Sequence, residues 1–122
     1  MAGGLFDEHP GVQVILGHLG ELLPFNIWRT DHRLEVKPAG IPARKPLRDY
    51  LRENFHVTTS GNFATPELLF TIDEVGADRV LFSADYPFES MAEAAAWFDA
   101  LALDREVHEK IAEGNARKLL GL

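Results

Sequence analysis

The sequence predicts an α/β protein in which helices cover a parallel sheet. Three short runs rich in β-branched and aromatic residues alternate with segments whose apolar residues recur at helical spacing. This alternation is typical of parallel strands joined by right-handed crossovers. With 122 residues, of which 46% are hydrophobic and 25% charged, residues 1–122 are interpreted as one folded unit.

The first strand is expected at residues 12–16, a run of mostly β-branched residues that ends at Gly17 and His18. Residues 21–34 carry an apolar face among polar residues, and a proline near their start suits the first turn of a helix. Residues 35–46 contain three prolines, which remove backbone donors and disfavour helix, so this segment is expected to be a loop.

A short helix is expected at residues 46–53 and a second β-rich strand at residues 55–59. The helix at 65–75 is indicated by Thr65 as its N-cap, by a proline at its first position and by Gly76 as its end. The central part of the chain therefore supplies one strand and two helices.

The third strand is expected at residues 79–84. Ser90, with Glu93 three residues later, forms the pattern of a capping box before an apolar helical face. Two further helices are expected at 104–112 and 115–120. An eight-stranded α/β barrel needs about 250 residues, so a chain with three strands is either a small open sheet or a piece of a larger fold.

Composition excludes several classes of protein. The net charge is −7, which repels phosphate backbones and anionic lipid, so neither nucleic acid nor a membrane surface is an expected partner. There is no cysteine, which excludes disulfides and thiolate chemistry and fits a reducing compartment. The sequence shows neither a secretory signal nor a long apolar stretch, so we expect a soluble, cytoplasmic protein.

Polar side chains follow each expected strand. The first strand is followed by His18 and Glu21, the second by Ser60, and the third by Asp85. Ligands of parallel α/β folds gather at the carboxyl ends of the strands, so these groups are candidate site residues. Imidazole beside carboxylate suits proton transfer, and it equally suits a metal, although catalytic zinc usually has three protein ligands.

Structural roles are the alternative for the same residues. His18 can be a hydrogen-bonded histidine at a strand end, Asp85 can cap the turn that follows it, and Glu21 can lie in the first turn of a helix. Arg29, on the expected helix, can belong to a solvated face or can bind a carboxylate.

Two motifs in this order resemble a known family. Val-Ile-Leu-Gly-His-Leu-Gly-Glu at residues 14–21 and Leu-Phe-Ser-Ala-Asp-Tyr-Pro-Phe-Glu at 81–89 are similar to strand-end motifs of the metal-dependent amidohydrolase-related family, in particular of its dihydroxybenzoate (γ-resorcylate-type) decarboxylases. The Trp-Arg pair at 28–29 and the segment 114–120 extend the resemblance to the whole chain.

The resemblance implies a distorted (β/α)8 barrel, with this chain as its carboxyl-terminal part, strands six to eight. It implies that Asp85 is a metal ligand and proton donor, that His18 is the catalytic histidine, that Glu21 supports His18, and that Arg29 binds substrate. The implied cofactor is a divalent zinc or manganese ion. The implied reaction is non-oxidative decarboxylation of a small aromatic carboxylate, a hydroxybenzoate.

The same resemblance implies that the site is incomplete in this chain. The family's first-strand ligand pair, Glu-x-His or His-x-His, is expected nowhere in this chain, and only Asp85 corresponds to a usual ligand. We therefore expect the isolated chain to be inactive, with both sheet edges unpaired and an inner face that needs a missing N-terminal barrel segment or a homo-oligomer. A metal-dependent hydrolase of the same family and a non-catalytic α/β binding module are the alternatives.

Overall fold

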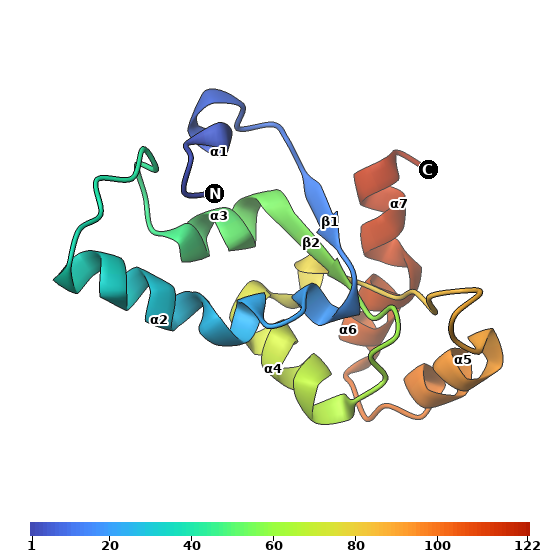
Figure 1. The fold of residues 1–122 in the computed structure, drawn as a ribbon. Coiled ribbons are helices and arrows are strands. Elements are labelled where there is room, and N and C mark those ends of the chain that lie inside the picture. The colour runs from blue at the N-terminus through green and yellow to red at the C-terminus, as the bar shows by residue number, and fades with distance from the viewer.

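A computed structural model describes residues 1–122 and confirms the α/β class (Figure 1). Strands β1 (Val14–Leu16), β2 (Phe55–Thr58) and β3 (Val80–Leu81) form one parallel sheet in the order β1-β2-β3. The sheet is open, as the chain length requires. In its register, Ile15 lies opposite His56 and Thr58 lies opposite Leu81.

Helices connect and flank the strands, in most places where the sequence predicts them. The α-helices are α1 (Leu5–Glu8), α2 (Leu23–Val36), α3 (Leu47–Asn54), α4 (Thr65–Val75), α5 (Met91–Asp99), α6 (Arg105–Glu109) and α7 (Asn115–Leu120). Single 3₁₀ turns η1 (His18–Gly20) and η2 (Ala77–Arg79) precede α2 and β3, and a π-helical turn η3 (Lys110–Gly114) joins α6 to α7. None of these helices is both long and apolar enough to span a membrane.

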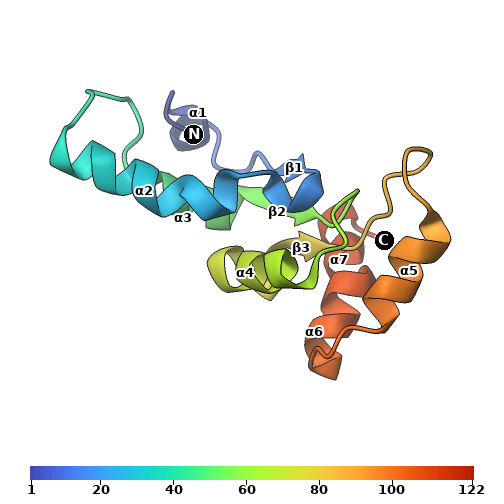
Figure 2. The ribbon, with the colours of Figure 1, turned by 60° about the horizontal axis from the view of Figure 1, so that its bottom comes forward.

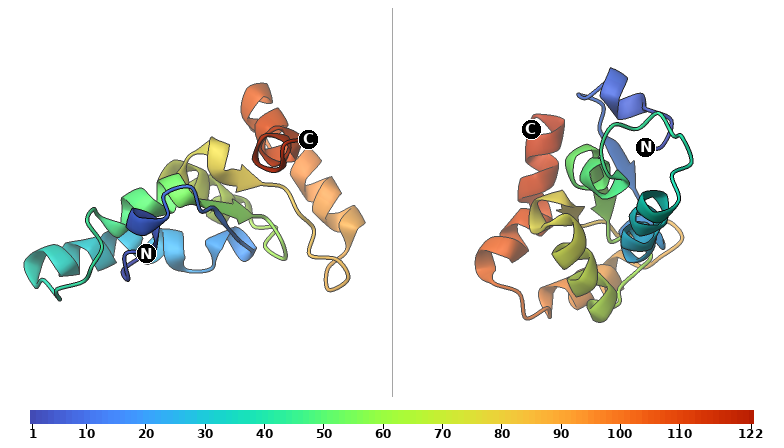
Figure 3. Two further views of the ribbon diagram at one scale, coloured as in Figure 1. Left: turned by 90° about the horizontal axis from the view of Figure 1, so that it is seen from above. Right: turned by 90° about the vertical axis from the view of Figure 1, so that its left-hand side faces the viewer.

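The helices form two groups, one packed along the strands and the other beyond the β3 edge of the sheet. Figure 2 shows α2, α3 and α4 along the strands, and α5 to α7 beyond β3. Figure 3 shows that the chain is elongated, with the carboxyl end of α2 and the last three helices at opposite ends. In Figure 2 the arrowheads of the three strands point to the same side, toward η1 and the segment that leads into α5.

A single apolar core joins these layers. Thirteen buried residues form one cluster, which includes Leu51, Leu68, Val80 and Ile111, none of them exposed to solvent. Phe6 of α1 also belongs to this cluster, and its ring meets that of Phe55 edge to face at 5.3 Å. The core therefore fixes the strands against helices from both ends of the chain.

Two local expectations are wrong, and a third is confirmed. The third strand is shorter than residues 79–84, because after Leu81 the backbone leaves the ladder and Ser83 N donates to the Thr59 hydroxyl at 2.9 Å. Thr65 is not the N-cap of α4: Ala64 takes that position, and the Thr65 hydroxyl accepts a hydrogen bond from Trp97 Nε1 at 3.2 Å. The cap at Ser90 is confirmed, since its hydroxyl accepts from the backbone N–H of residue 93 at 3.3 Å.

Neither β1 nor β3 has a strand partner on its outer side, as expected, but the outer edge of β3 forms hydrogen bonds with the C-terminal helices. On the outer edge of β3, Phe82 N donates to Ile111 O at 2.9 Å, and Asn115 Nδ2 donates to the carbonyls of Val80 at 2.8 Å and Ala77 at 2.7 Å. The π-helical turn brings these groups beside the strand. The outer edge of β1 has no such contacts from the helices.

We expect Asn115→Ala to lower the free energy of unfolding by about 1–3 kcal/mol, because it removes the side-chain donor from the buried carbonyl of Val80. Asn115 is only 6% exposed. Urea unfolding measures the change. Asn26→Ala is the matched control, since the exposed Asn26 amide also donates to a carbonyl, that of Leu22. A change of less than about 0.5 kcal/mol is expected for the control, and the same small change at Asn115 would contradict the prediction.

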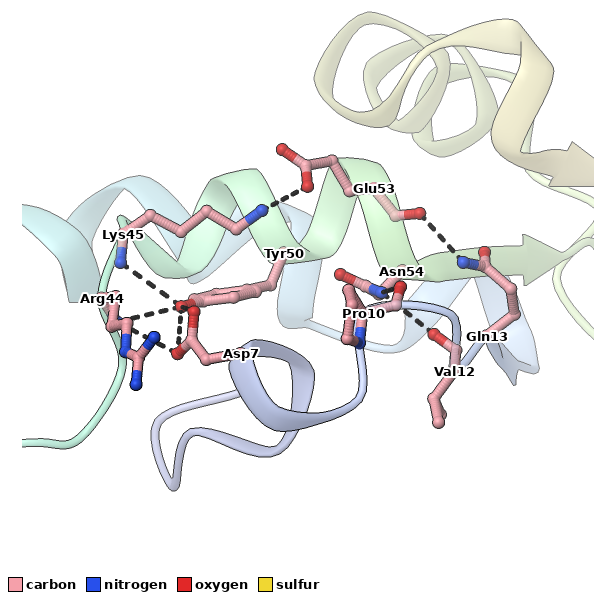
Figure 4. Close-up of polar contacts among 9 residues, drawn as sticks. All are labelled: Asp7, Pro10, Val12, Gln13, Arg44, Lys45, Tyr50, Glu53 and Asn54. Atoms are coloured by element: carbon pink, nitrogen blue, oxygen red, sulfur yellow. Dashed lines mark hydrogen bonds and ion pairs between the residues drawn. The ribbon is translucent and has the colours of Figure 1, made fainter.

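The N-terminal segment is held on α3 by a buried tyrosine (Figure 4). Tyr50 is fully buried, and its hydroxyl donates to the Asp7 carboxylate at 2.6 Å and accepts from Arg44 N at 3.0 Å and Lys45 N at 3.3 Å. The Tyr50 hydrogen bond lowers the pKa of Asp7. The Tyr50 side chain thus connects α1 and the loop before α3 to α3 itself.

Next to it, Asn54 at the end of α3 donates to the carbonyls of Pro10 and Val12, both at 3.0 Å (Figure 4). These bonds fix the backbone that enters β1. The start of β1 is therefore set by α3 and not by a strand partner alone.

We expect Tyr50→Phe to destabilise the chain by about 1–3 kcal/mol at neutral pH, because the Asp7 carboxylate loses its donor and Lys45 N loses its acceptor, whereas Arg44 N keeps its bond to Asp7. The lowered pKa of Asp7 means that its contribution is present above the pKa of the unfolded chain and is lost as pH falls through the folded value. The difference between wild type and Tyr50→Phe should therefore shrink on acidification. Urea midpoints at neutral and acidic pH test this, and a difference that is constant with pH would contradict it.

Candidate active site

The imidazole of His18 is presented by an unusual backbone. Directly after β1, the φ angles are 51° at His18, 54° at Leu19 and 56° at Glu21, all in the left-handed region. Such conformations cost about 1–2 kcal/mol for a non-glycine residue, so they persist only where packing enforces them. The Leu19 side chain, 2% exposed, anchors this turn in the core, while the side chains of His18 and Glu21 stay open to solvent.

Three of the predicted site residues meet at the carboxyl ends of β1 and β3. His18 Nδ1 lies 2.8 Å from Glu21 Oε1, and His18 Nε2 lies 3.6 Å from Asp85 Oδ2. The hydrogen bond to Glu21 is the main cause that raises the pKa of His18, and Asp85 acts in the same direction. All three side chains keep access to solvent.

The contacts of Asp85 and Glu21 differ from those expected of a turn cap and a helix first-turn residue. The turn after Asp85 is closed by its backbone carbonyl, which accepts from Phe88 N at 2.9 Å and Glu89 N at 3.2 Å, and the carboxylate takes no part. Glu21 precedes α2, which begins at Leu23, and its side chain binds the His18 ring. Both carboxylates are thus directed at the imidazole.

Two other candidates lie outside this group. Arg29 is exposed on α2 and forms no hydrogen bond or ion pair with His18, Glu21 or Asp85, so its role in substrate binding stays a prediction. Ser60 bonds the Thr58 hydroxyl at 2.7 Å. The contribution of the second strand comes instead from Thr59, which the sequence predicts as the last strand residue, and from Gly61 in the turn that follows.

The residues of this chain do not by themselves fit a divalent metal. The chain contains no group of three or more histidine or carboxylate side chains that could hold an ion. The letters Glu-x-His do occur at residues 106–108, but on α6, where His108 Nε2 contacts the Phe98 carbonyl and Glu106 pairs with Lys110.

The parallel strands, with a histidine and carboxylates at their carboxyl ends, define a chain of the amidohydrolase type. The profile of the amidohydrolase family matches residues 1–122, and the chain belongs to this family. This result confirms the family resemblance of its two strand-end motifs.

Relatives give the comparison more detail. A γ-resorcylate decarboxylase of Rhizobium sp. is 52% identical over 124 residues, and a 2,6-dihydroxybenzoate decarboxylase in complex with 2,6-dihydroxybenzoate superimposes with a TM-score of 0.95 at 51% identity. A dihydroxybenzoic acid decarboxylase of Polaromonas sp., solved with manganese and the inhibitor 2-nitroresorcinol, gives a TM-score of 0.94 at 46% identity. Each match covers 99% or 100% of this chain.

The chain is much shorter than these relatives. It spans 38% of the Rhizobium protein, 38% of the 2,6-dihydroxybenzoate decarboxylase and 37% of the Polaromonas enzyme. The chain therefore has the fold of one part of these proteins. Its assignment to the last three β/α units stays a prediction.

Proposed function

We propose that this chain contributes part of the active site of a metal-dependent decarboxylase, a carboxy-lyase that acts on a hydroxybenzoate-type aromatic acid. The observation that carries the proposal is the imidazole of His18 held between the carboxylates of Glu21 and Asp85. The substrate named for these relatives supports this substrate class, since γ-resorcylate and 2,6-dihydroxybenzoate are the same hydroxybenzoate.

Non-oxidative decarboxylation replaces a ring carboxylate by a proton and releases carbon dioxide, so the site must deliver one proton to a ring carbon. His18 is suited to hold that proton, because the two neighbouring carboxylates favour its charged form. Glu21 fixes the ring through Nδ1, which leaves Nε2 facing Asp85 at 3.6 Å. In this proposal His18 supplies the proton and Asp85 receives it and passes it to the ring carbon.

The remaining roles rest on the same proposal. Asp85 is one ligand of a divalent zinc or manganese ion, and the other ligands belong to segments outside this chain. Arg29 binds the substrate carboxylate. The three strands correspond to strands six to eight of a barrel that a missing N-terminal segment or a homo-oligomer completes in the cytoplasm, and the open edge of β1 is suited to such pairing.

The test is reconstitution. The chain is co-expressed with the part of the Rhizobium γ-resorcylate decarboxylase that it does not cover, and the purified complex receives Mn²⁺ and 2,6-dihydroxybenzoate. We expect resorcinol and carbon dioxide as products. A complex that assembles, binds Mn²⁺ and hydrolyses lactones while leaving 2,6-dihydroxybenzoate intact would support the hydrolase alternative. Assembly and Mn²⁺ binding without turnover of either substrate would support a binding module.

A further inference from the structure

We propose that the turn after β2, residues 59–62, is a positioning element that holds the Asp85 carboxylate against the His18 ring. This proposal rests on the proposed function and adds to it, because the turn lies between the two strand ends that carry these side chains. Two independent features of the turn carry it, Gly61 and Thr59.

Gly61 allows the close approach of the two side chains. The turn is closed by Asn62 N, which donates to Thr59 O at 2.9 Å, and Gly61 has a φ of +61°. A Cβ at this position would lie 3.1 Å from His18 Cδ2 and 3.2 Å from Asp85 Oδ2. The absence of a side chain thus leaves the space in which imidazole and carboxylate meet.

Thr59 fixes the backbone that leads to Asp85. The last ladder bond of β3 runs from Thr59 N to Leu81 O, at 3.0 Å. The fully buried Thr59 hydroxyl then accepts from Ser83 N at 2.9 Å and donates to Ser83 O at 2.8 Å. These two bonds hold the end of β2 to the backbone after β3, at Ser83, which lies two residues before Asp85.

The first test separates contact at the site from backbone strain. Gly61→Ala introduces both, whereas Gly61→Asn tolerates a positive φ but still carries a Cβ. Gly40→Ala is the matched control, because Gly40 has a φ of +65° and nothing within 4 Å of the position of its Cβ. The readouts are the ¹⁵N and ¹³C resonances of the His18 ring at one fixed pH and the Asp85 amide resonance, with thermal unfolding measured in parallel.

We expect both Gly61 variants to shift the His18 and Asp85 resonances and the Gly40 variant to leave them in place. Unchanged resonances in a folded Gly61 variant, or equal shifts in Gly40→Ala, would overturn the proposal. The measurement needs neither metal nor substrate, so its failure is distinguishable from failure of the proposed decarboxylase.

A second pair of variants decides the question if Gly61→Ala does not fold. Thr59→Val should raise hydrogen exchange at the Ser83 amide about tenfold and shift the Asp85 resonance, and Thr59→Ser, which keeps the hydroxyl, should restore both. Thr71→Val, at another buried threonine, should change neither. A valine variant in which the Asp85 and His18 resonances stay at their wild-type positions would contradict a positioning role.

Discussion

Replacing His18 with alanine in the reconstituted complex is expected to lower kcat/KM for 2,6-dihydroxybenzoate by about 10²–10⁴-fold, the range of general acid–base catalysis. His18 is the one titratable group that contacts both carboxylates of the site, and its Nε2 faces Asp85 at 3.6 Å. Its removal takes away the proposed proton source and leaves Glu21 and Asp85 without the ring that both contact. Steady-state kinetics at saturating Mn²⁺ measure the effect.

The matched control for this experiment is His32→Ala. His32 is exposed on α2 and stacks on Trp28 at 5.1 Å, without contact to the site. The control should retain wild-type kcat/KM. Equal activity of His18→Ala and wild type, with assembly unchanged, would remove His18 from the catalytic machinery.

The largest effect on stability is expected from Glu74→Ala, a loss of about 3 kcal/mol, because the two hydrogen bonds that the carboxylate accepts from Arg48 are charge-assisted. The Glu74 side chain is only 8% exposed, and it binds Arg48 through two hydrogen bonds, the longer of which is 2.7 Å. Its backbone carbonyl also accepts from Arg52 Nε at 2.7 Å. Removal of the carboxylate leaves two guanidinium groups without their buried anion, between α3 and α4.

Glu113→Ala is the matched control for the buried ion pair. Glu113 also pairs with an arginine, Arg117, at 3.0 Å, but its side chain is 66% exposed. An exposed helix pair contributes about 0.3–0.5 kcal/mol, so the control should unfold at nearly the wild-type urea concentration. Equal losses for the two variants would show that burial of Glu74 does not determine its contribution.

Strand and helix positions follow closely from the sequence because local patterns determine them. The β-branched run before Gly17 predicts β1, and the pattern from Ser90 to Glu93 predicts the start of α5. The short α1 is different, because Phe6 is held by packing on Phe55 and not by a local helical pattern. The outer edge of β3 likewise depends on Asn115, 35 residues farther along the chain.

The candidate site is predictable to the extent that strand ends converge in a parallel sheet. His18, Glu21 and Asp85 lie together for that reason. Gly61 could not be singled out, because a Ser-Gly-Asn turn has the same sequence signal whether or not two site residues pack on the glycine. The raised pKa of His18 also depends on distances that spacing alone does not provide.

The most direct test of the account compares the isolated chain with the reconstituted complex. Both receive Mn²⁺ and 2,6-dihydroxybenzoate labelled with ¹³C in its carboxylate, and labelled carbon dioxide is measured. We expect release by the complex and none by the isolated chain, because the chain has no group of three or more side chains that could hold the metal ion. Release of labelled carbon dioxide by the isolated chain, or none by an assembled complex with bound Mn²⁺, would contradict it.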